Sequence, residues 1–171
     1  MSDFAPAPAA PLGAALADLL GELVDGPPPT GGYMLNRGDG GLLRSLAGLS
    51  AADASRPSPA GGGSVAAHVE HLRYGLSLMN RAAAGENPFA DADWAASWRL
   101  GTVTDAEWAA RRAALADEAR RWRAALAAVG DPGAVHPMML RGMIGSVAHL
   151  AYHLGALRQL APAARGPAAN D

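Results

Sequence analysis

Hydrophobic positions recur with the period of an α-helix in four long segments of the chain. The first begins at Pro11, a residue suited to a first helical turn, and its apolar positions are Leu12, Leu16, Leu19, Leu20 and Leu23. Gly26-Pro27-Pro28-Pro29 follows at once, and a helix cannot continue through it. We therefore predict a first helix from Pro11 that ends before Gly26.

The next segment, residues 30–63, is rich in glycine and proline. Its only short helical pattern consists of Leu42, Leu43, Leu46 and Leu49. We predict a long connection that contains one or two short helices and lies over the rest of the domain. Gly61-Gly62-Gly63-Ser64 is not followed by the Gly-Lys-Ser/Thr of a phosphate-binding loop, so we interpret it as a flexible lead-in.

The second long helix is predicted from Ser64, a good N-cap, to about Ala84, with Gly85 as its stop. Its apolar stripe is Val65, Val69, Leu72, Leu76 and Met79. His68 and His71 lie beside that stripe. The polar connection that follows carries Trp94 and Trp98.

Thr104-Asp-Ala-Glu107 has the pattern of a capping box and predicts the start of a third helix that runs to Ala128. Apolar residues recur there at intervals of seven, at Trp108, Leu115, Trp122 and Val129. The arginines and acids of this helix fall largely on other faces, which is typical of a solvated surface. A basic patch that binds a partner is the alternative.

A fourth helix is predicted from about Leu140 to Leu160, stopped by Pro162, after a turn over residues 130–138. Four long helices without an alternating strand pattern predict an all-α fold, a four-helix bundle with a long crossover connection between its first two helices. The predicted organisation is a flexible arm over residues 1–10, the bundle over 11–162 and a flexible tail over 163–171.

Composition narrows the range of functions. The chain has no cysteine, which excludes disulfides, thiolate ligands and a cysteine nucleophile, and all 14 basic residues are arginine, which excludes Schiff-base chemistry. A net charge of -2 gives no electrostatic basis for binding nucleic acid. Since the sequence lacks a long apolar run or a leader pattern, we expect a soluble, cytoplasmic protein that does not bind membranes.

Four of the five histidines form two pairs on predicted helices, His68 with His71 and His149 with His153. Residues four apart on a helix lie on one face, so both rings of the second pair can reach one point. Neutral imidazoles from two facing helices can bind zinc, nickel or iron, and three such ligands leave a position open. The alternative is that these are hydrogen-bonded or partly exposed helix histidines. His136, which precedes a proline in the turn, is interpreted as a surface residue.

Two motifs resemble the DinB-like superfamily, which includes the bacillithiol transferases and the metal-binding N-terminal domains of ergothioneine-pathway sulfoxide synthases. They are Ser64-Val-Ala-Ala-His-Val-Glu-His71 and His149-Leu-Ala-Tyr-His153, the latter continued by Leu-Gly-Ala-Leu-Arg-Gln. The resemblance implies a divalent-metal site formed by His71, His149 and His153. His68 departs from this three-ligand pattern and is left as a hydrogen-bond donor behind the ligands, a fourth ligand or a wall of the site.

The resemblance further implies a metal-dependent enzyme that activates a low-molecular-weight thiol or water for S-transfer, isomerisation or hydrolysis, and a homodimer. A non-catalytic metal- or ligand-binding module and a dimerisation unit are the alternatives. No catalytic residue is assigned. General acid or base roles are open to Glu70, Tyr74, Asp93 and Tyr152, with Glu70 otherwise expected at the surface and Tyr152 in the core or the pocket wall. Arg158 is expected to cap the carbonyl groups at the end of the fourth helix, or else to orient an anionic substrate.

Overall fold

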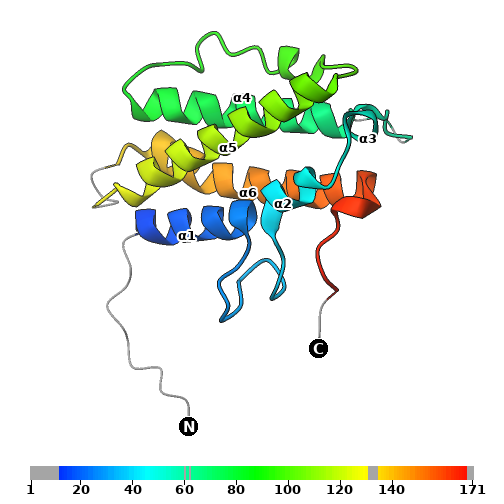
Figure 1. Cartoon of the computed structure of the whole chain (residues 1–171). Helices are drawn as coiled ribbons and strands as arrows, with labels where there is room; N and C mark the ends of the chain where they lie inside the picture. Colours follow the sequence, from blue (N-terminus) through cyan, green and yellow to red (C-terminus); the bar gives the residue numbers. More distant parts are fainter. Residues whose placement is uncertain (1–11, 60, 62, 131–134, 169–171) are drawn as a thin grey trace.

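The chain folds as an all-α bundle in the computed structural model, which describes residues 12–59, 61, 63–130 and 135–168 (Figure 1). Each of α1 and α4 packs against both α5 and α6, so the four long helices enclose one core. The predicted fold class is therefore confirmed. The four long helices are α1 (Leu12–Asp25), α4 (Val65–Ala83), α5 (Asp105–Ala127) and α6 (Pro137–Leu160).

The long connection between α1 and α4 contains two short helices, α2 (Gly41–Ala47) and α3 (Ala51–Ser55), as predicted. Two short 3₁₀ turns complete the described structure: η1 (Ala96–Trp98) between α4 and α5, and η3 (Pro162–Ala164) after α6. The described helices include none with the length and apolar character that crossing a membrane requires.

Local capping chemistry sets the helix starts. The Ser64 hydroxyl accepts the Ala67 N–H at the start of α4, and Thr104 and Glu107 form the predicted capping box of α5. The start predicted for α6 was wrong: the helix begins at Pro137, one turn earlier than expected. The exposed His136 is its N-cap and accepts the Met138 N–H through Nδ1.

The seven-residue pattern of α5 marks its core face. Trp108, Leu115 and Trp122 are buried, as is Leu126. The indole N–H of Trp108 donates to the Leu49 carbonyl at 2.8 Å, which ties α5 to the crossover connection. This bond gives a buried polar group the partner it needs.

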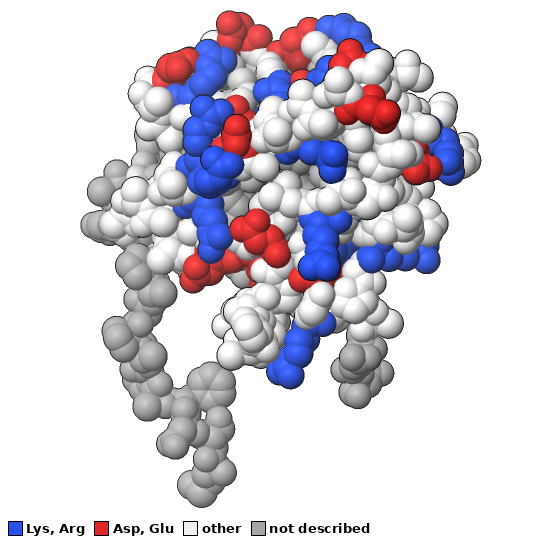
Figure 2. Space-filling view, viewed as in Figure 1, with Lys and Arg blue, Asp and Glu red and all other residues white. Residues whose placement is uncertain are grey.

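Charges of both signs are mixed on the face of the molecule that Figure 2 shows. Four arginines of α5 are paired with acids: Arg111 with Glu70, Arg120 with Asp117, Arg121 with Glu118 and Arg123 with Asp25. This arrangement fits a solvated face better than a basic binding patch.

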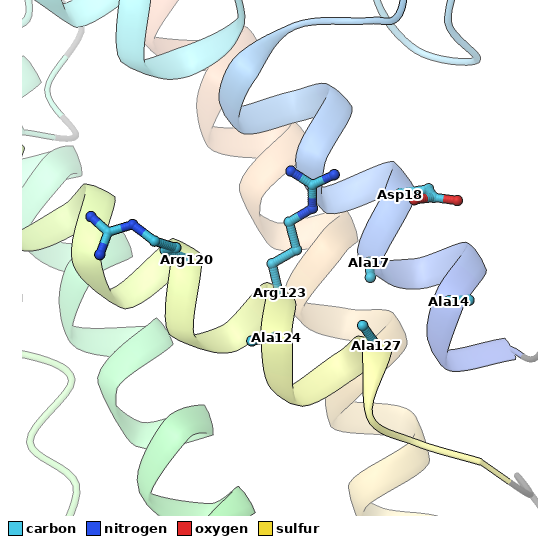
Figure 3. A pocket seen from close by; sticks show the side chains of 7 residues that line it. All are labelled: Ala14, Ala17, Asp18, Arg120, Arg123, Ala124 and Ala127. Atoms are coloured by element: carbon cyan, nitrogen blue, oxygen red, sulfur yellow. The ribbon is translucent and has the colours of Figure 1, made fainter.

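A hollow of about 360 Å³ lies between α1 and α5 because small residues line it. Figure 3 shows Arg123 reaching from α5 toward α1, whereas Arg120 points away. The lining contains no histidine and only one carboxylate, Asp18, so it does not supply a metal-ligand set. The other lining residues are Ala14, Ala17, Ala124 and Ala127.

A buried ion pair joins α6 to the crossover connection. Arg158 donates two hydrogen bonds to Asp39, at 2.9 and 2.7 Å, and a third to the Ser45 hydroxyl. The side chains of Asp39 and Arg158 are only 3% and 15% exposed. The expected capping role of Arg158 was therefore wrong, because its guanidinium is used between elements far apart in the sequence. The chain after α6 also packs here: Ala164 is buried, and the Pro167 carbonyl accepts a bond from Asn36.

We predict that Asp39→Ala lowers the free energy of unfolding by about 3 kcal/mol, because it leaves the Arg158 guanidinium buried without its counter-ion. The measurement is urea denaturation followed by circular dichroism. Asp117→Ala is the matched control, since it removes the exposed ion pair with Arg120 and should cost less than about 0.5 kcal/mol. Similar losses in both variants would contradict a structural role for the buried pair.

Candidate metal centre

Three histidines from two neighbouring helices converge inside the bundle. His71 comes from α4, and His149 and His153 come from α6. The Nε2 atom of His149 lies 3.1 Å from that of His71 and 2.9 Å from that of His153. His71 and His153 are only 7% and 4% exposed, whereas His149 is partly exposed. The three side chains form a group that could hold a metal ion.

The chemistry and spacing of these donors suit a divalent transition metal. Two nitrogens bound to one tetrahedral zinc ion at 2.0–2.1 Å are about 3.3 Å apart. The two observed separations involving His149 are only a few tenths of an ångström shorter. Small outward shifts of the rings would therefore accommodate an ion, and an all-nitrogen set suits zinc, nickel or iron.

Burial keeps the imidazoles neutral. Desolvation, and then the neighbouring His149 and His68, lower the pKa of His71 to about 4. Desolvation, and then the three other histidines, lower the pKa of His153 to about 3. Burial also lowers the pKa of His149. At neutral pH the three rings therefore have the uncharged form that a metal ligand needs.

His68 lies behind the three converging nitrogens. Its Nδ1 is 2.8 Å from Nδ1 of His153, the nitrogen of that ring that does not face His149. This is the position of a group that orients a ligand, since metal-binding histidines commonly hydrogen-bond through their other ring nitrogen.

The connection between α4 and α5 covers the histidines with two tryptophans. Trp98 stacks on His71 with ring centroids 4.3 Å apart, and it meets His68 edge-on at 4.9 Å. The Trp94 ring lies 5.5 Å from that of His71. Ser97 lies between the two tryptophans in the sequence, and its Oγ is 2.8 Å from Nδ1 of His71.

The sequence did not identify Trp94, Ser97 and Trp98 as part of the site. Their signal was weak but visible: two tryptophans four residues apart, with a serine between them, in a segment that is otherwise polar. Nothing in their spacing indicated that the connection turns back over α4.

The other residues considered for acid or base roles have structural partners. Glu70 is partly buried, not at the open surface. Burial raises its pKa, but the hydrogen bonds and ion pairs with Arg73 and Arg111 together outweigh that effect, so the pKa is lowered. The hydroxyl of Tyr74 accepts the backbone N–H of Asp93.

Of the two positions expected for Tyr152, the core was wrong, because this side chain is 72% exposed. Its ring still meets that of His153 edge-on, with centroids 5.1 Å apart. Asp93 is exposed as well, and its carboxylate accepts the Ala96 N–H at the start of η1 and pairs with Arg99.

Comparison with known families agrees with the bundle and its histidines. The family model of the DinB superfamily matches residues 34–157, more than half of the chain, and this range includes all three converging histidines. No curated protein and no solved structure matches the chain. With its helical bundle and a histidine group that could hold a metal, the chain belongs to the DinB superfamily.

Proposed function

We propose that this protein is a divalent-metal-dependent enzyme in which His71, His149 and His153 hold the ion. The convergence of their Nε2 atoms is the observation that carries the proposal. A low-molecular-weight thiol or water is the proposed nucleophile, and the reaction is of the S-transferase, isomerase or hydrolase type.

A divalent ion bound by three neutral imidazoles retains its positive charge and lowers the pKa of a thiol or water at an open position. The protein's own residues supply the binding and the surroundings. Because the chain has no cysteine, the thiol of a transfer reaction has to come from the substrate. His68 approaches His153 from behind instead of joining the Nε2 cluster, which supports three ligands and an open position.

The two tryptophans that cover the histidines, Trp94 and Trp98, determine which side of the candidate metal centre a substrate can reach. Trp98 lies against the buried rings of His71 and His153 and shields them from water. His149 and Trp94 are partly exposed, so we propose that a substrate enters beside them. Gly75 borders both residues: a side-chain Cβ there would lie 3.4 Å from Trp94 and 3.9 Å from His149. Gly75 is itself buried, so its lack of a side chain lets the Trp94 and His149 rings lie close to α4.

The second candidate is a non-catalytic module that binds a metal or another ligand. The burial of His71 and His153 favours it, because a closed site with a fourth protein ligand would stabilise the fold without reacting. Metal content alone does not distinguish the enzyme from the non-catalytic module, whereas reactivity toward substrates does.

We predict that protein produced without an affinity tag contains a divalent metal and that His153→Ala abolishes its binding. Elemental analysis and calorimetric titration with zinc or nickel measure this. His136→Ala is the control: it removes an exposed helix cap and should leave the stoichiometry of binding unchanged, even if the melting temperature falls. Equal losses of binding in both variants, or a wild-type protein that binds no metal, would overturn the assignment of the metal site.

The proposed catalysis predicts turnover in a screen of the metal-loaded protein with several biological thiols and electrophiles. Loss of the thiol group and formation of product are followed by absorbance and mass spectrometry. We expect activity that disappears on chelation and returns with the metal. If the loaded protein converts none of these combinations and shows no hydrolase or isomerase activity, the non-catalytic module is the better description.

We also propose that the protein is a cytoplasmic homodimer. Met138, Ile144 and Tyr152 are exposed large apolar residues of α6, and an exposed apolar surface favours association. Light scattering coupled to size exclusion should give twice the mass of the chain for the wild type and the mass of one chain for Ile144→Glu. A monomeric wild type would contradict the dimer without bearing on the metal.

A further inference from the structure

Ser97 holds the ring of His71 through a hydroxyl with two partners. Its Oγ lies 2.8 Å from Nδ1 of His71 and donates to the Trp94 carbonyl at 2.7 Å. Ser97 is 5% exposed and lies in η1, the turn that packs on α4. The turn therefore contacts the candidate site through a specific polar group as well as through its tryptophans.

The count of hydrogens determines the direction of the bond to histidine. A hydroxyl has one hydrogen, and a carbonyl oxygen can only accept. Because the Ser97 hydrogen is used on the Trp94 carbonyl, Nδ1 of His71 has to be the donor and Ser97 Oγ the acceptor. A neutral imidazole has only one N–H, so Nε2 of His71 is left with a lone pair that faces His149.

We propose that Ser97 is a positioning residue for the metal: it keeps His71 in the Nδ1–H form, so that Nε2 is ready to bind. This inference rests on the proposed metal-binding function. Two contacts restrain the ring together, since the hydrogen bond sets its edge and the stacked Trp98 ring, 4.3 Å away, restrains its face. Part of the metal site is thus built by the connection between α4 and α5.

Removal of the hydroxyl has a defined consequence. In Ser97→Ala, Nδ1 of His71 loses its acceptor, and the hydrogen can move to Nε2, where it blocks the lone pair. Loss of a group that orients a metal ligand typically weakens metal affinity about 10- to 100-fold, and we expect a loss in this range. Ser97→Thr keeps a hydroxyl and should bind zinc within about threefold of the wild type.

Ser77→Ala is the matched control. Its hydroxyl donates to the carbonyl of Tyr74, three residues earlier, at 2.7 Å, just as Ser97 donates to that of Trp94. Loss of a serine-to-carbonyl bond is therefore common to both variants, whereas the contact with His71 belongs to Ser97. Zinc affinity should be unchanged in Ser77→Ala.

The deciding experiment combines zinc titration against a competing chelator with nitrogen-15 NMR of the histidine rings in the metal-free full-length protein. We expect His71 of the wild type and of Ser77→Ala to have the Nδ1–H form, and that of Ser97→Ala to move toward Nε2–H, with weaker zinc binding. An Nε2–H form in the wild type, an unchanged zinc affinity in Ser97→Ala, or an equal loss in Ser97→Thr would overturn the proposal.

A merely structural role for Ser97 would lower the melting temperature without changing the ring form. Because that form is measured without metal, its outcome is separate from that of the proposed function. A wild type in the Nδ1–H form that binds no zinc would refute the metal function and, with it, the role of Ser97 toward the metal. A wild type that binds zinc with His71 in the Nε2–H form would refute the Ser97 proposal alone.

Discussion

Four imidazole rings pack between α4 and α6, three of them buried and that of His149 partly exposed, and this packing is the constraint on which the bundle interior depends. Each ring carries polar nitrogens, and a buried polar group without a partner costs about 1–3 kcal/mol. The rings meet that demand largely among themselves, through nitrogen contacts of 2.8 to 3.1 Å that link His68, His71, His149 and His153. A bundle with apolar residues at these positions would not face this cost. The polar cluster therefore calls for a functional explanation, and a bound cation would use nitrogens that already point toward one another.

The rest of the bundle holds the two ligand-bearing helices in place. α4 begins at the Ser64 cap and is tied to α5 by Asn80, whose amide donates to the backbone and side chain of Glu118. α6 is anchored by Arg158, five residues after His153, through the buried pair with Asp39. These anchors lie outside the group of converging histidines. Metal-ligand distances tolerate only small errors, so a stable scaffold of this kind is what a three-nitrogen centre requires.

The sequence allowed much of the fold to be predicted because the relevant signals are local. Caps at Ser64 and Thr104 and the apolar stripes on their helices depend on residues a few positions apart, and the structure has them as expected. The start of α6 was predicted too late because His136, which caps the helix, was interpreted only as a surface residue and not as a possible N-cap. Local patterns thus predict elements better than they predict the role of an individual polar side chain.

Contacts between distant segments explain what could not be predicted. Spacing on α6 put His149 and His153 on one face, but the resemblance to a family was needed to select His71 over His68. No pattern paired Arg158 with Asp39, 119 positions away, or placed Ser97 against His71. The exposure of Tyr152 likewise depends on which face of α6 the other helices leave uncovered.

The chemistry proposed for this site follows from the nucleophilic side chains that the sequence lacks and from the neutral imidazoles that the bundle encloses. Without cysteine or lysine, it has neither a thiolate nor a side-chain amine to act as a nucleophile. Its neutral imidazoles carry no charge to offset that of a metal ion, so the full charge would remain available to an anionic ligand. In the proposed reaction, a thiolate substrate would bind the ion without competition from a cysteine of the chain. The Trp98 ring, which lies against His71 and His153, would strengthen that attraction by limiting the access of water to these buried rings.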